Sequence, residues 1–171
     1  MIRIAAVAAA IAVLSGCGYH VAGRGDLLPK TVKTIAVPAF GNVTTQHKLA
    51  ERLPADITRE FIARTRYTIV AEPDRADAVL TGAVVNQFAY TSVADPSTGR
   101  STGVLVSVVI QVTLTERATG KVLFTRPGME VRERYEISVD PKVYFDESEV
   151  AMQRLSRDVA RSVVSAVLEN F

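Results

Sequence analysis

The chain has 171 residues, of which 48% are hydrophobic, and its 20 basic and 18 acidic residues leave a formal net charge of +2. This length and apolar content suit a single domain with a sizeable core. The near balance of charge argues against a general attraction to nucleic acid, and a single cysteine excludes an intramolecular disulfide.

The N-terminus carries the pattern of an export signal. Arg3 is followed by an apolar segment, residues 4–14, that is too short to cross a bilayer as a helix. The segment ends in Leu14-Ser15-Gly16-Cys17, which resembles the lipobox of bacterial lipoproteins, whose cysteine is acylated after cleavage. We therefore expect removal of residues 1–16 and a membrane anchor of acyl chains, palmitate among them, on Cys17. The alternative is an ordinary export signal followed by an inert cysteine.

Residues 17–33 are expected to form a lipidated tether, because they contain several glycines and a proline and show no sustained periodicity. The rest of the chain, residues 34–171, is expected to form one domain. It contains no apolar segment long enough for a transmembrane helix.

The domain is predicted to open with a β-α-β unit. Residues 34–40 predict a buried strand whose end or edge position is marked by Pro38. An apolar residue at every fourth position predicts an amphipathic helix, and Pro54 either kinks this helix or begins its regular part. Residues 67–70 predict a second strand, parallel to the first. The apolar stripe of the helix consists of Leu49, Leu53, Ile57 and Phe61.

The following residues are typical of antiparallel structure. Residues 79–90 predict a long strand in which Gly82 marks a bulge or bend, and residues 95–103 predict a hairpin tip. Residues 104–115 alternate between apolar and polar side chains, as in a half-buried strand. In the last strand the apolar positions change phase at Pro127-Gly128, which predicts a bulge that keeps both halves facing the core.

A final helix with one apolar stripe is predicted to open at residues 146–149, whose acidic groups suit the positive end of the helix dipole. The order of elements predicts an α+β fold. We expect a two-layer sandwich, β-α-β-β-β-α, with two helices packed on one face of a four- to five-stranded mixed β-sheet. The other face of the sheet is expected to be more polar and partly wet.

The sequence shows no pattern typical of an enzyme. No motif links His20 or His47 to a nucleophile, and no motif for nucleotide binding, zinc proteolysis or redox chemistry occurs. Asp74 and Asp77 fit turn positions better than an acid–base pair. We expect no enzymatic activity, no cofactor and no metal, although a hydrolase site assembled from residues without a pattern stays open.

Five basic residues are candidates for a binding site. The three arginines of the last strand are predicted to project to one side of it. The other two basic residues are expected on the hairpin tip and in the loop before the final helix. One interpretation is a solvated strand face with ion pairs. The other is contact with the phosphates of a lipid headgroup, since arginine suits bidentate phosphate binding. The five residues are Arg100, Arg126, Arg132, Arg134 and Lys142.

Several segments spread over the chain form one recognisable set. They are Cys17-Gly18-Tyr19-His20-Val21, Leu28-Pro29, Ile35-Ala36-Val37-Pro38-Ala39-Phe40 with Asn42, Ala76-Asp77-Ala78-Val79-Leu80-Thr81-Gly82 and the apolar C-terminal helix. Together they resemble the LPS-assembly lipoprotein family (LptE-type) over nearly the whole mature chain. The resemblance implies a non-enzymatic protein anchored in the outer membrane, with its domain on the periplasmic side and inside the lumen of a large β-barrel partner (LptD-type). Such proteins plug the barrel, assist its assembly and bind lipopolysaccharide on its way to the cell surface.

The main alternative is an envelope lipoprotein that serves as a scaffold for another secretion or transport complex and makes no contact with glycolipid. Gly18, rather than aspartate, follows the cysteine, which resembles lipoproteins released to the outer membrane. Both interpretations give the protein a membrane anchor and a protein partner, and neither involves nucleic acid.

Overall fold

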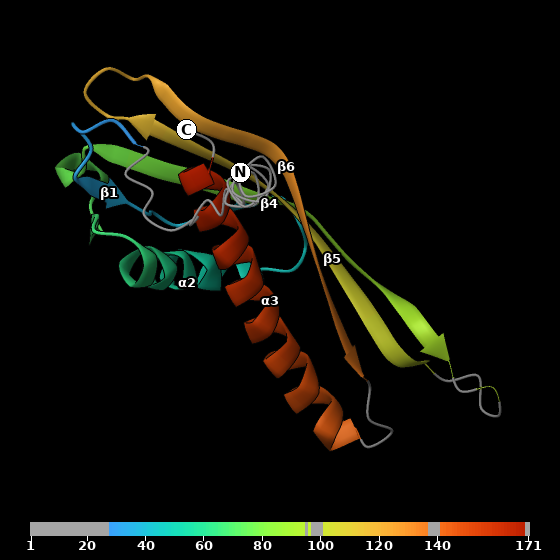
Figure 1. Cartoon of the computed structure of the whole chain (residues 1–171). Coiled ribbons are helices and arrows are strands. Elements are labelled where there is room, and N and C mark those ends of the chain that lie inside the picture. Colours follow the sequence, from blue (N-terminus) through green and yellow to red (C-terminus); the bar gives the residue numbers. More distant parts are fainter. Residues whose placement is uncertain (1–27, 95, 97–100, 137–140, 170–171) are drawn as a thin grey trace, which may run out of the picture.

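A computed structural model describes residues 28–94, 96, 101–136 and 141–169. Cys17 and Arg100 therefore lie outside the described residues. The elements follow in chain order (Figure 1): β1 (Thr34–Ala36), β2 (Gly41–Asn42), α2 (Lys48–Arg64), β3 (Thr68–Val70), the 3-10 turn η1 (Pro73–Arg75), β4 (Ala78–Ala94), β5 (Ser101–Glu116), β6 (Val122–Glu136) and α3 (Pro141–Glu169).

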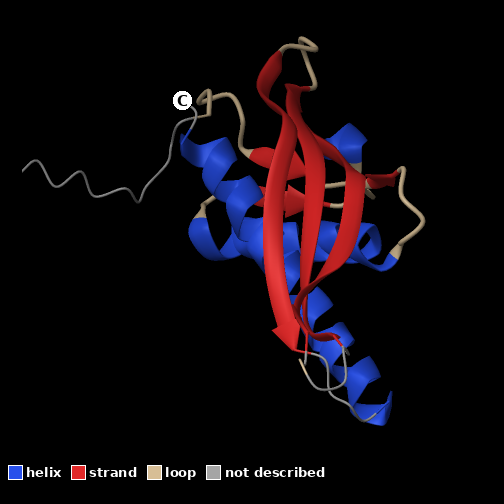
Figure 2. Ribbon diagram, turned by 90° about the vertical axis from the view of Figure 1, so that its right-hand side faces the viewer, coloured by secondary structure: helices blue, strands red, loops and turns tan. Residues whose placement is uncertain are grey.

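One mixed sheet organises the fold. Its strands lie in the order β3-β1-β4-β5-β6, and β2 pairs with β4 beside β1. β1 is parallel to both β3 and β4, whereas β4, β5 and β6 are antiparallel. Both helices cover the same face of this sheet (Figure 2). The predicted α+β fold is therefore confirmed. The described part of the chain gives the sheet six strands instead of four or five, because the residues after Pro38 form the short extra strand β2.

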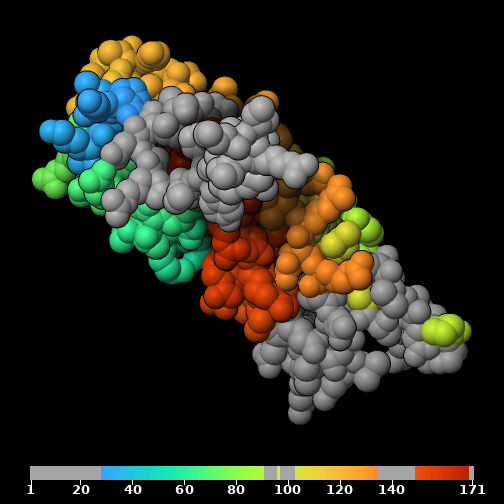
Figure 3. All heavy atoms as spheres, in the orientation of Figure 1, coloured from blue at the N-terminus to red at the C-terminus, as the bar shows by residue number. Residues whose placement is uncertain are grey.

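The three long strands continue well beyond the short ones. On β4, the pairing with β1 and β2 covers only the first part of the strand, up to Val84. Past this point β4, β5 and β6 form a three-stranded extension, which we call the arm, and which comprises residues 86–94, 101–109 and 129–136. The arm and the first half of α3 project away from the end of the molecule that holds β1 and α2 (Figure 1), the end that is blue and green in Figure 3. The molecule is consequently elongated.

The periodicities of the sequence correspond to buried faces. The predicted stripe of α2 is fully buried, from Leu49 to Phe61. The helix begins at Lys48 and contains Pro54 in its interior, so the alternative that it starts at the proline is wrong. The helix α3 begins at Pro141, earlier than the predicted start at residues 146–149, with the proline in its first turn, where a missing N–H costs nothing.

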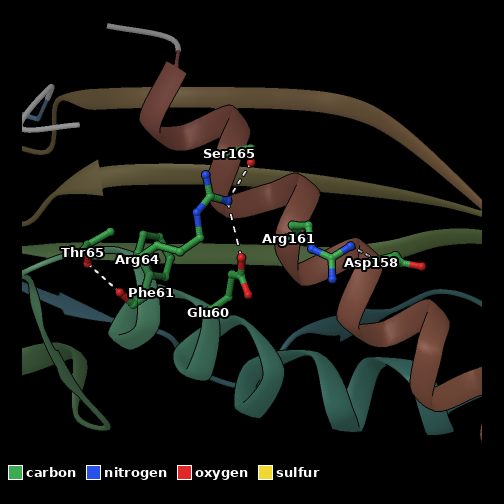
Figure 4. Close-up of polar contacts among 7 residues, drawn as sticks. All are labelled: Glu60, Phe61, Arg64, Thr65, Asp158, Arg161 and Ser165. Carbon is green, nitrogen blue, oxygen red and sulfur yellow. Dashed lines mark hydrogen bonds and ion pairs between the residues drawn. The ribbon is translucent and has the colours of Figure 1, made fainter. Parts of the chain in front are cut away.

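Polar contacts join the two helices. The carboxylate of Asp56 on α2 is buried and accepts hydrogen bonds from Ser156 Oγ of α3 at 2.5 Å and from Arg59 Nη1 at 2.6 Å. Further along, Arg64 Nη1 donates to Ser165 Oγ at 2.7 Å and lies 3.4 Å from Glu60 Oε1 (Figure 4). Removing a partner from the buried Asp56 contact should cost more than removing one from the exposed contact, because water can replace the partner only at the exposed site.

The antiparallel half of the sheet follows the predicted pattern. Alternate residues of β5 from Val104 to Leu114 are buried against the helices. The register of β5 with β6 shifts between Ile110 and Val112, opposite Pro127-Gly128, which confirms the predicted bulge. Because of this bulge, even-numbered Phe124 and odd-numbered Met129 lie on the same inner face, opposite Leu114 and Ile110.

Of the two predicted alternatives at Gly82, a bulge or a bend, the bulge is wrong. The ladder with β5 is regular from Ala78 to Val84, and its first register shift lies between Val84 and Asn86. Gly82 instead makes room for the ring of Phe40: a β-carbon at this position would lie 2.2 Å from Phe40 Cε1. The glycine is thus explained by the close approach of a side chain distant in sequence.

The segment before β1 is part of the core. Leu28 and Val32 are 4% exposed and belong to the buried cluster that includes Ile35 and Val167. Sequence analysis assigned both residues to the tether, because a segment rich in glycine and proline shows no periodicity. In the structure, the packed part of the chain already includes Leu28.

Candidate functional site

An aspartate clamp holds β1 against β4. The Oδ2 atom of Asp77, just before β4, accepts hydrogen bonds from the N–H of Lys33 at 2.9 Å, the N–H of Thr34 at 2.9 Å and the hydroxyl of Thr34 at 2.8 Å. These bonds, with that from the Lys33 N–H first, lower the pKa of Asp77 below its ordinary value. Asp77 therefore has a structural role in the bend before β4, in agreement with the turn position predicted for it.

Asn42 organises the loop that leads into α2. Its Oδ1 accepts from the N–H of Thr44 at 3.0 Å, and its Nδ2 donates to the carbonyl oxygens of Thr44 and Gln46, each at 3.2 Å. The same amide lies 2.9 Å from Nδ1 of His47, the residue that precedes α2. His47 is therefore part of a loop network, and the network fixes where α2 begins relative to β4.

The outer face of the arm, which points away from the helices, carries two exposed aromatic rings. Phe88 and Tyr90 of β4 are 43% and 45% exposed, and their rings stack with centroids 6.0 Å apart. Each ring is aligned across the sheet with an arginine of β6. Phe88 lies opposite Ser107, and Ser107 lies opposite Arg132. In the same way, Tyr90 lies opposite Leu105, and Leu105 lies opposite Arg134. The expected polar outer face thus includes an aromatic and basic patch.

Arg132 is engaged in an ion pair on this face. Its guanidinium donates to both carboxylate oxygens of Glu130, at 2.8 and 3.0 Å, and Glu130 also accepts from the hydroxyl of Ser107 at 2.5 Å. The Arg132 hydrogen bond is the main cause of a lowered pKa of Glu130, and Glu130 in turn raises the pKa of Arg132. Arg132 is therefore less available for a ligand than Arg134, its neighbour on this face.

The three arginines of β6 do not share one side, contrary to the prediction. Arg126 lies opposite Val112 of the inner face, whereas Arg132 and Arg134 lie on the outer face beyond the bulge. Residues directly opposite each other in a ladder share a face, so the shift of register that reorients the apolar positions also separates the basic ones. Arg134 forms no ion pair with the residues whose side chains are described. The structure places Lys142 in the first turn of α3 without describing its side chain.

A cleft of about 580 Å³ lies between the inner face of the arm, the start of α2 and the first half of α3. Buried apolar side chains, among them Leu49, Val106 and Leu155, contribute to its lining. Ion pairs surround it: Lys48 and Arg52 each pair with Glu149, and Arg154 pairs with Glu133. Its volume is in the range of small-molecule and peptide-anchor pockets. Sequence analysis missed this cleft, because its residues come from elements and loops far apart in the chain.

Among the described residues, no group of three or more histidine, cysteine, aspartate or glutamate side chains is arranged to hold a metal ion. Neither described helix is long and apolar enough to cross a membrane.

Comparison with known families gives one match that covers most of the chain. Residues 32–167 match the model of the family LptE, described as lipopolysaccharide-assembly. The matched region runs from the segment before β1 to the last turns of α3 and so includes the whole sheet and both helices. No curated protein matches the chain.

Solved structures with the same fold include several lipoproteins. An uncharacterized lipoprotein B from Nitrosomonas europaea is 14% identical, with a TM-score of 0.55 over 88% of this chain and 90% of the other. A minor lipoprotein from Acinetobacter baumannii is 11% identical, with a TM-score of 0.51 over 81% and 94%. The PelC dodecamer from Paraburkholderia phytofirmans is 18% identical, with a TM-score of 0.50 over 85% and 93%. At these identities the likeness shows the fold alone.

Proposed function

Because the chain belongs to the LptE family of lipopolysaccharide-assembly proteins, we propose that it is a non-enzymatic outer-membrane lipoprotein that plugs a large β-barrel partner, assists its assembly and binds lipopolysaccharide during insertion at the cell surface. The family match over residues 32–167 carries this proposal, because it spans the folded domain rather than a single motif. The shape of the domain is compatible with the role. A wide barrel has a polar interior, and an elongated module with an exposed, charged strand such as β6 can occupy it.

The anchor is the first part of the proposal. Acyl chains on Cys17 hold the domain at the membrane, and they contribute nothing to its core, whose first described residue is Leu28. Cys17→Ala should release the protein into the soluble envelope fraction while its circular dichroism and its unfolding transition stay as in the wild-type domain. A Cys17→Ala protein that stays in the membrane, or one that no longer folds, would contradict this assignment.

Contact with the phosphates of lipopolysaccharide is the second part. We assign it to Arg100 and Lys142 and, on β6, to Arg134 ahead of Arg132 and Arg126, because Arg132 is already paired with Glu130. Charge-assisted hydrogen bonds to phosphate are strong and depend on salt. Charge reversal at Arg100, Lys142 or Arg134 should therefore weaken binding of purified lipopolysaccharide to the full chain in a salt-sensitive way.

Arg75 supplies the matched control. It is exposed in η1, on the side of the sheet formed by the short strands β1 and β3. Charge reversal at Arg75 should leave lipopolysaccharide binding unchanged. Equal loss at Arg75 and at the assigned residues would show a general effect of charge and would remove the proposed contacts. In the cell, depletion of the protein should reduce the lipopolysaccharide that reaches the outer leaflet, and an unchanged amount would contradict the function itself.

A further inference from the structure

Within the described residues, the edge of β4 in the arm has no neighbouring strand. On the side away from β5, β2 pairs with β4 at Ala83 and Val84, and Val43 N–H donates to the carbonyl of Val84 at 3.0 Å. Beyond this point no strand within the described part of the chain pairs with that side of β4. The other side of β4 forms a regular ladder with β5 from Asn86 to Thr91. The arm therefore presents an ordered strand with backbone groups available along one edge.

The two long edges of the arm differ sharply in charge. Within the arm the β6 edge contains five charged residues, a feature that protects a sheet edge from pairing with another chain. β4 contains no charged residue over its whole length, from Ala78 to Ala94. The sequence thus protects one edge and leaves the other suitable for pairing.

The open edge lies beside binding surfaces on both faces of the sheet. On the inner face, Gln87 and Ala89 line the cleft. Gln87 Nε2 donates to Gln46 Oε1 at 2.7 Å, and the Oε1 of Gln87 is buried without a hydrogen-bond partner among the described residues. On the outer face, the stacked rings of Phe88 and Tyr90 stand next to the same edge.

We propose that an extended, uncharged segment of a protein partner adds to β4 as a further strand along Asn86–Thr91. Alternate side chains of the added strand enter the inner cleft and pack on the Phe88–Tyr90 rings. Main-chain hydrogen bonds supply affinity in this mode of recognition, and the two side-chain surfaces supply specificity. The identity of the partner as the β-barrel rests on the proposed function.

Photocrosslinking tests the proposal in the native envelope. The full chain carries p-benzoylphenylalanine in place of Tyr90, an aromatic-for-aromatic change at the open edge, or in place of Val122, which is 52% exposed on β6. We expect a crosslink from position 90 to a contiguous uncharged segment of the barrel, identified by mass spectrometry, and none to that segment from position 122. A crosslink from position 90 only to lipid, to a second copy of this chain or to nothing would overturn the proposal.

A matched pair of lysine substitutions provides the second test. Ala89→Lys introduces a charge at the open edge and should lower the amount of barrel that co-purifies with the full chain by about tenfold, whereas Val122→Lys on the protected edge should not. Equal recovery with Ala89→Lys and wild type would overturn strand addition and leave the proposed function intact. Absence of the barrel from the wild-type preparation would instead count against the proposed function.

Discussion

Substitution of Gly82 by alanine tests the contact that joins β4 to the segment after β1. The added β-carbon would lie 2.2 Å from Cε1, 2.7 Å from Cζ and 2.8 Å from Cδ1 of Phe40. Carbon atoms in van der Waals contact are about 3.5–4.0 Å apart, so the ring must move by more than about 1 Å. Phe40 is only 8% exposed and packs in the core, so this movement disturbs its neighbours. Overpacking of this kind costs about 1–3 kcal/mol.

The assay is urea unfolding of the domain, followed by circular dichroism, with Gly128→Ala as the control. At Gly128 a β-carbon would meet only Val109 Cγ1 at 3.9 Å, an ordinary contact, and the free energy of unfolding should not fall. In the double variant Gly82→Ala/Phe40→Leu the smaller side chain relieves the clash, and the two changes should be non-additive by about 1 kcal/mol or more. Wild-type stability of Gly82→Ala, or strict additivity in the double variant, would refute the reasoning.

Three other predictions concern stability. Asp77→Asn should lower the free energy of unfolding at pH 7 by about 1–3 kcal/mol, because charge-assisted hydrogen bonds are lost. Folding lowers the pKa of Asp77, so its contribution to the free energy of unfolding is complete above the unfolded pKa of 3.8 and is lost as the pH falls through the folded pKa. The stabilities of wild type and variant should therefore converge at acid pH. A stability difference that does not depend on pH would contradict the clamp. Pro54→Ala should raise the free energy of unfolding by up to about 3 kcal/mol, because it restores an N–H inside α2, and a less stable variant would show that the proline is needed for packing. Leu28→Ala should lower the free energy of unfolding by about 2–5 kcal/mol, whereas Thr31→Ala, at an exposed position, should lower it much less. Equal effects of the two substitutions would show that Leu28 does not belong to the core.

The parts of the fold that sequence predicted are those determined by local periodicity. The alternation from Val104 to Leu114 and the phase change at Pro127-Gly128 each correspond to observed structure, because the side chains that report a face are neighbours in the chain. Gly82 and Leu28 were misinterpreted for the opposite reason. The space at Gly82 is occupied by Phe40, and the burial of Leu28 depends on side chains distant in sequence, none of which a local pattern records.

For the candidate site, the sequence identified some of the residues but not their faces or their partners. Sequence identified Arg126, Arg132 and Arg134 as a group, but their faces depend on the shift of register with β5, and the pairing of Arg132 depends on Glu130 and Ser107. The open edge of β4 has a visible signal, the absence of charge, yet the edge itself is defined by where β2 stops pairing. The cleft could not be predicted from the sequence, because it depends on how both helices are arranged over the arm.

The most direct test of the central claim is quantitative affinity purification of the full-length chain from native envelopes, with the composition of the complex measured by mass spectrometry. Our account predicts a large β-barrel protein in near-equimolar amount, together with lipopolysaccharide. A stable complex with other envelope proteins that contains neither the barrel nor lipopolysaccharide would contradict it.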